Sequence, residues 1–162
     1  MTEINRNHPR QQRRRQPHTP PRPSATLPPA YQNVRSYFDN GVLRREFLLD
    51  WAQAIAKSFE QDRLTTGQIR RFFTATRRIE QRLLLARKMG LPTDAILCDV
   101  MRLAPIAVYA GNRNAGNRNV VPEIFVEFIQ KNVALVHSTE DFLGGFLPHF
   151  ECVLGFANLR DR

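Results

Sequence analysis

The chain has 162 residues, a length typical of one domain around a single hydrophobic core. It carries 24 Lys and Arg against 15 Asp and Glu, a formal net charge of +9. No apolar run is long enough to span a bilayer, and the N-terminus lacks the apolar stretch of a signal peptide, so we expect a soluble cytoplasmic protein. Cys98 and Cys152 are too few for a disulfide framework, and we expect both among apolar residues in a reducing compartment.

The basic residues are mostly arginine, because Lys57, Lys88 and Lys131 are the only lysines. Arginine forms forked hydrogen bonds to phosphate and stacks on bases, so this composition favours a nucleic-acid partner. Charge alone leaves open the alternative of a basic protein whose charge serves solubility.

The first 30 residues or so differ in composition from the rest of the chain. They hold seven of the eleven prolines and the run Arg13-Arg14-Arg15, with few large apolar side chains. Such a segment cannot bury enough surface to offset the entropy lost on ordering. We therefore assign residues 1–40 to a disordered basic tail, which either grips RNA loosely or is passive, and residues 41–162 to the folded domain.

Apolar residues recur with the 3.6-residue period of a helix through most of the folded domain. No segment alternates with period two, and we predict no hairpin. The expected fold is all-α, a compact bundle of about five helices. The predicted helices cover Val42–Asp62, the residues from the Thr65 cap to Lys88, Asp94–Ala110, a segment opened by Pro122, and a segment capped by Ser138.

The ends of the second helix have clear signals. Thr65 and Gln68 have the spacing of a capping box, in which each side chain bonds to the backbone N–H of the other residue. Gly90 is expected to stop this helix in the left-handed conformation.

Two helices contain residues that interrupt helical structure. Pro105 is expected to kink the third helix. Gly144, Gly145 and Pro148 are expected to bend or weaken the last one, and the sequence offers no reason for their presence.

A concentrated positive charge is predicted on the second helix, where five of the arginines fall within about 140° of arc opposite its apolar face. They are Arg70, Arg71, Arg77, Arg78 and Arg82. The only carboxylate on this helix, Glu80, is expected at the edge of the core. Like charges on one face repel one another unless a polyanion neutralises them, so the face predicts phosphate binding. A solvated face with small counterions is the alternative.

The loop after the third helix contains Gly-Asn-Arg-Asn twice, at residues 111–114 and 116–119. Gly and Asn tolerate positive φ, which predicts a mobile loop. Backbone amides beside Arg113 and Arg118 would make good phosphate donors, although an ordinary polar loop would look the same.

Signatures of catalysis are missing from the sequence. It has no phosphate-binding glycine loop, nucleophile elbow or helical zinc-protease motif. His149 and Cys152 form the only compact pair, without further metal ligands or an orienting group, and we expect both at the edge of the core. We predict no catalytic residue, no metal site and no cofactor.

Three stretches, in this order, resemble the small-subunit family of type III-A CRISPR (Csm) effector complexes. They are Leu64–Phe73, Leu103–Arg113, and Phe125–Ile129 with the aromatic run that continues through Phe150. The long tail and the repeated Asn-Arg-Asn loop depart from the family pattern.

The resemblance implies a non-catalytic subunit of a ribonucleoprotein in antiviral defence. Several copies would associate into a minor filament beside the backbone subunits and the large subunit, and would hold guide RNA paired with target RNA. Matching motifs extend an RNA-binding role to Arg70, Arg71 and Arg113, whereas Arg77, Arg78, Arg82 and Arg118 depend on the charge argument alone.

A helical DNA-binding regulator is the alternative function, with the second helix as its recognition helix. Recognition helices usually mix arginine with Asn, Gln or Ser directed at base edges, and they follow a short partner helix. The long and nearly all-arginine face favours phosphate contact over base reading.

Overall fold

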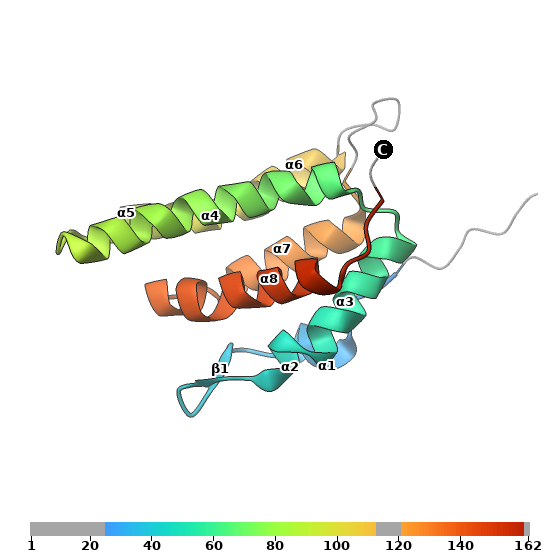
Figure 1. The fold of residues 1–162 in the computed structure, drawn as a ribbon, viewed down its shortest axis with the longest axis horizontal. Helices are drawn as coiled ribbons and strands as arrows, with labels where there is room; N and C mark the ends of the chain where they lie inside the picture. The colour runs from blue at the N-terminus through green and yellow to red at the C-terminus, as the bar shows by residue number, and fades with distance from the viewer. Residues whose placement is uncertain (1–24, 113–120, 161–162) are drawn as a thin grey trace, which may run out of the picture.

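The computed structural model describes residues 25–112 and 121–160, which form a helical bundle in three layers (Figure 1). In the first layer α4 lies with α5 and α6, the second contains α7 and α8, and the third contains α1 to α3. The helices are α1 (Pro29–Asn33), α2 (Arg45–Leu48), α3 (Asp50–Gln61), α4 (Thr66–Lys88), α5 (Asp94–Met101), α6 (Leu103–Asn112), α7 (Glu123–Leu135), the π-helix η1 (Asp141–Phe146) and α8 (Leu147–Phe156). The all-α prediction is confirmed.

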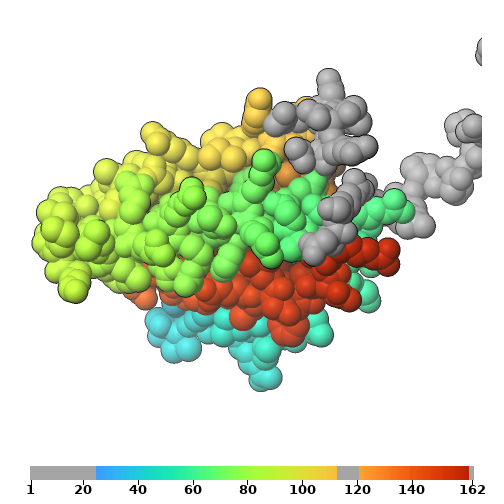
Figure 2. All heavy atoms as spheres, turned by 45° about the horizontal axis from the view of Figure 1, so that its top comes forward, coloured from blue at the N-terminus to red at the C-terminus, as the bar shows by residue number. Residues whose placement is uncertain are grey.

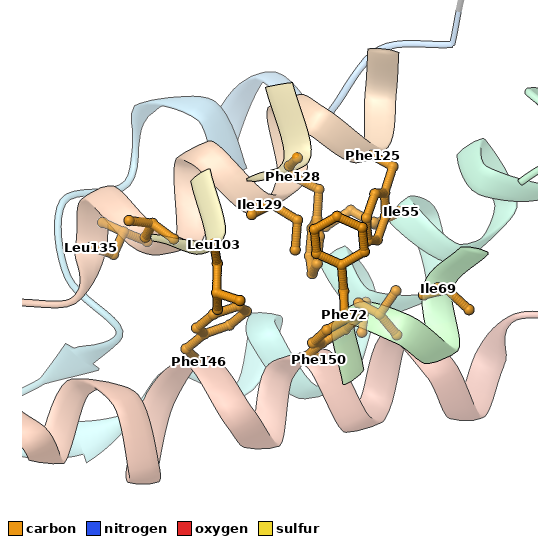
Figure 3. Packing of buried hydrophobic residues seen from close by; sticks show 14 of the residues in the cluster. Ile55, Ile69, Phe72, Leu103, Phe125, Phe128, Ile129, Leu135, Phe146 and Phe150 are labelled. Atoms are coloured by element: carbon orange, nitrogen blue, oxygen red, sulfur yellow. The ribbon is translucent and has the colours of Figure 1, made fainter. Parts of the chain in front are cut away.

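Aromatic side chains fill the space between the layers (Figure 3). Phe72 of α4 meets Phe125 of α7 edge-on, with ring centroids 4.9 Å apart. Phe150 of α8 lies 5.4 Å from Phe128 of α7. Ring contacts of this kind stabilise aromatic pairs beyond their buried area, and here an edge-on pair ties α4 to α7 and a tilted pair ties α8 to α7.

Helix α4 begins and ends as the sequence predicts. The Thr65 hydroxyl accepts from the Gln68 amide N–H at 3.4 Å, and the Gln68 side chain accepts from the Thr65 N–H at 2.9 Å. Gly90 has φ +67, so it terminates the helix in the left-handed conformation. Both local predictions are confirmed.

The prediction of one helix from Val42 to Asp62 is wrong at its start. Strands β1 (Phe38–Asp39) and β2 (Val42–Leu43) form a small antiparallel hairpin. Asn40 and Gly41 both have positive φ, +49 and +78, as a tight hairpin turn requires. Leu49, with φ −122 and ψ −88, then separates α2 from α3. The Asn-Gly pair was the signal that our sequence analysis missed.

Pro105 breaks the third predicted helix instead of only kinking it. Proline has no N–H to donate to the Met101 carbonyl, and its ring crowds that same carbonyl. The α-helix accordingly stops at Met101, and α6 starts at Leu103.

The last predicted helix begins as the π-helix η1, and the reason lies in its glycines. A Cβ on Gly145 would lie 2.4 Å from the ring of Tyr37, and one on Gly144 would lie 3.2 Å from the ring of Phe38. The glycines therefore let the β1 segment pack directly against this helix, which the sequence alone did not reveal.

The N-terminal boundary of the domain also needs correction, because residues 25–40 pack on the bundle. Leu27, Tyr31 and Tyr37 are all buried. The Lys131 ammonium of α7 donates to the carbonyl oxygens of Gln32 and Val34, both at 2.7 Å. These contacts order the segment despite its polar composition. The rest of the predicted tail, residues 1–24, lies outside the described residues.

Candidate nucleic-acid interface

Helix α4 forms a ridge across one face of the molecule, with α6 on one side and α8 on the other (Figure 2). Its orientation is set by buried apolar residues that point into the bundle. They are Ile69, Phe72, Ile79, Leu83 and Ala86. The five arginines predicted for the opposite face are all exposed: Arg70, Arg71, Arg77, Arg78 and Arg82.

Two of these arginines are paired with carboxylates, most of which come from other helices. Arg77 lies 3.1 Å from Glu80 on its own helix and 2.7 Å from Glu151 of α8. Arg82 pairs with Asp99 of α5. The five-arginine face is therefore less positive than its sequence suggests, because neighbouring helices supply carboxylates on both of its sides.

The remaining three, Arg70, Arg71 and Arg78, form what we call the open arginine face. Within residues 25–112 and 121–160, no carboxylate lies within ion-pair distance of any of them. Arginine keeps its charge at any physiological pH, so this face carries three uncompensated positive charges on one helix.

The predicted loop residues Arg113 and Arg118 lie outside the described residues. The two ends of their loop are described, and they lie close together. The Val121 N–H donates to the Ala110 carbonyl oxygen at 3.4 Å. Ala110 and Val121 line the same groove as Arg71, so the described residues on both sides of the loop lie beside the open arginine face.

The family model described as Csm2 Type III-A matches residues 44–159, which include all of α4 and the bundle around it. The chain belongs to the Csm2 Type III-A family. It is thus the small subunit of a type III-A CRISPR effector complex. No curated protein and no solved structure shows a significant match to it. The Csm2 match begins after the packed N-terminal segment, so Tyr31 and Tyr37 lie outside the matched residues.

His149 of this Csm2-family chain lies in the core, more deeply than predicted. Its side chain is fully buried, and its Nδ1 is 2.5 Å from the Phe47 carbonyl oxygen. A carbonyl only accepts, so Nδ1 carries the proton and Nε2 accepts from the Tyr31 hydroxyl at 3.3 Å. Burial lowers the pKa of His149 to about 4, partly offset by the bond to Phe47, so the imidazole is neutral at physiological pH.

Asn132 completes this buried network, which the sequence analysis did not foresee. Its Nδ2 donates to the Tyr31 hydroxyl at 2.6 Å and to the Phe128 carbonyl oxygen at 2.8 Å. Its Oδ1 accepts from the Tyr37 hydroxyl at 2.8 Å. Every side chain of the network is thus satisfied, which indicates a role in the fold and not in a reaction.

The two cysteines differ from each other in environment. Cys152 is half-buried. The pKa of its thiol is raised mainly by burial and also by the negative charge of Glu151. Cys98 is exposed on α5, so its predicted position among apolar residues is wrong.

The described residues contain no cluster of three His, Cys, Asp or Glu side chains that could hold a metal. In the same part of the chain, no helix has both the length and the apolar character to cross a bilayer.

Proposed function

We propose that this Csm2-family subunit holds the guide RNA–target RNA duplex by its phosphate backbone, without reading sequence and without catalysis. The observation that carries this proposal is the open arginine face, three exposed guanidinium groups on α4 with no described carboxylate beside them. Forked guanidinium groups match phosphate oxygens, and binding phosphates releases the counterions condensed on RNA.

Arg77 and Arg82 have a secondary part in this proposal. Their ion pairs are exposed, and exposed pairs contribute at most about 1 kcal/mol. A phosphate can therefore replace the carboxylate, but the exchange leaves Glu151 or Asp99 without its partner. We rank Arg70, Arg71 and Arg78 above the paired arginines for this reason.

The proposal also includes several copies of the subunit along the RNA. They stack in the cytoplasm as a minor filament beside the backbone subunits and the large subunit. Each copy contributes only a few phosphate contacts. Linking copies makes the later contacts intramolecular, so the array holds RNA far more tightly than one subunit does. The N-terminal tail, Arg113 and Arg118 would add further contacts of the same kind.

Removing one arginine of the open arginine face is expected to flatten the salt dependence of RNA binding. Arg70→Ala and Arg78→Ala, and Arg113→Ala from the loop, should each reduce the log–log slope by about 0.7 to 0.9 for each lost contact. Affinity should fall equally for two RNAs of unrelated sequence, because phosphates carry no sequence information. The measurement is binding by the assembled complex across a salt series.

Two matched variants sharpen this test. Arg77→Ala removes the adjacent but paired guanidinium and should change the slope less than Arg78→Ala. Arg45→Ala removes an exposed charge from α2, in the layer farthest from α4, and should change nothing (Figure 1). Unchanged slopes for all of the Arg70, Arg78 and Arg113 variants would refute the proposal. A loss of about 1–3 kcal/mol confined to one base sequence would instead support the DNA-binding regulator.

Exposed leucines are expected to contribute to assembly of the complex. Leu85 is 57% exposed near the end of α4 that projects beyond α8, and Leu49 is 40% exposed before α3 (Figure 1). Leu84, Met89 and Leu91 are also exposed near Leu85, which makes an apolar surface of the kind found at protein interfaces. Leu85→Asp and Leu49→Asp should leave the circular dichroism spectrum unchanged, and at least one should reduce incorporation into the purified complex. Normal incorporation of both would show that neither residue anchors a contact.

A further inference from the structure

A groove of about 260 Å³ runs between α4 and α6, directly beside the open arginine face. Arg71, Phe72 and Ala75 of α4 form one wall, and Ile106 and Tyr109 of α6 form the other. Figure 2 shows the two helices side by side at this face. The groove is thus bounded by apolar side chains, with a guanidinium group in its lining.

Tyr109 is exposed in a way that the fold does not explain. Its side chain is 69% exposed, whereas Tyr31 and Tyr37 are fully buried and hydrogen-bonded. Among the described residues, its ring meets no other aromatic ring and its hydroxyl has no hydrogen-bond partner. Ile106, one turn earlier on α6, is 53% exposed. A flat aromatic face and an aliphatic neighbour are therefore open to a ligand.

The charge around the groove restricts what that ligand is. No Asp or Glu is among the described residues that line it, and Arg71 lacks a described carboxylate partner. The groove therefore suits a ligand that combines a flat, weakly polar ring with a negative charge close by. A nucleotide has this combination, because its base presents a π-face and its phosphate follows within one sugar.

We propose that the groove binds one unpaired nucleobase of the RNA, stacked on Tyr109, while Arg71 pairs with the adjacent phosphate. A base inside a duplex is already stacked on both sides, so the occupant must be unpaired. Stacking is tolerant of sequence, because every base has a π-face. This inference depends on the proposed RNA-binding function and adds to it a contact with a base.

The test compares Tyr109→Ala with Tyr109→Phe in the full chain at low salt. Three probes are used: a single-stranded RNA, a fully paired RNA duplex, and a single strand of the same length with abasic sites throughout. Tyr109→Ala should weaken binding of the base-containing single strand by about tenfold. It should leave binding of the duplex and of the abasic strand unchanged, and Tyr109→Phe should bind as the wild type does, because it keeps the stacking ring.

The outcomes separate this inference from the proposed function. If Arg78→Ala weakens binding of all three probes and Tyr109→Ala weakens none, the phosphate contacts stand and the base site is refuted. An equal loss on the single strand, the duplex and the abasic strand would also refute the base site, because no unpaired base would then be involved. A change in oligomeric state with unchanged RNA binding would identify the groove as a contact between copies and overturn the inference.

Discussion

Replacing Gly145 by alanine is expected to lower the free energy of unfolding by about 3 kcal/mol, near the upper end of what overpacking costs. The added Cβ would lie 2.4 Å from Cγ of the Tyr37 ring, a distance that real contacts do not allow. Tyr37 cannot move away easily, because it is fully buried and its hydroxyl is held by Asn132. Urea denaturation of the two proteins at neutral pH measures the difference.

Gly155→Ala is the matched control, in the α8 helix that directly follows η1. No atom lies within 4 Å of a Cβ built on Gly155, so the added methyl group meets no neighbour. Alanine also loses less backbone entropy than glycine in a helix, and we expect a gain of about 0.5 to 1 kcal/mol. If both variants changed stability by the same amount, close packing against Tyr37 would not be the reason for Gly145.

The stability of the protein is expected to fall by about 3 kcal/mol between pH 6.5 and pH 4 because of His149 alone. The pKa of this residue is lowered from 6.5 to about 4 in the folded chain, chiefly by burial. The unfolded chain therefore binds a proton first as the pH falls, and protonation favours unfolding by about 1.4 kcal/mol for each pH unit. The contribution of the neutral His149 to the free energy of unfolding is complete above pH 6.5 and is lost as the pH falls to about 4.

The hydrogen bonds explain why the folded chain resists this proton. Nε2 of His149 is the acceptor for the Tyr31 hydroxyl, which itself accepts from Asn132. A proton on Nε2 would face the Tyr31 oxygen and remove the only acceptor that the network offers to the Tyr31 proton. Protonation of His149 would thus add a buried charge and also break the chain of hydrogen bonds that runs from Asn132 through Tyr31 to Nε2.

A variant without a titratable group at this position isolates the effect from that of the carboxylates. His149→Asn keeps a polar group near the position of Nδ1 and should be less stable than the wild type at pH 7.5. The difference between their free energies of unfolding should narrow as the pH falls to about 4. Denaturation of both proteins at each pH would measure it. His137→Gln removes an exposed histidine as the control. A difference in the free energy of unfolding that stays constant across this pH range would contradict a neutral, buried His149.

Most features encoded within a few consecutive residues were predicted correctly from the sequence. The Thr65–Gln68 capping box, the Gly90 stop and the apolar face of α4 all depend on neighbours within one or two helical turns. The Asn40-Gly41 turn is equally local, but the helical period of the residues that follow it masks the hairpin.

Other features required the packing of distant segments. Tyr31 and Tyr37 bond to Asn132 across 101 and 95 residues of the chain, and His149 bonds to Tyr31 across 118. No local period of the sequence predicts contacts of this kind. The reason for the two glycines of η1 is the β1 segment that packs directly against them, a contact that the sequence does not predict. The ordered N-terminal segment follows from these same contacts, which its composition does not disclose.

By itself the sequence determined the helical class, the position of α4 and the row of five arginines on its outer face, because helical periodicity is a local property of the chain. Which of those arginines have a carboxylate partner among the described residues was decided by the tertiary structure. Glu151 and Asp99 reach Arg77 and Arg82 from α8 and α5, and such pairings depend on how the helices lie against one another. The same packing left Arg71 and Tyr109 on facing helices of one groove.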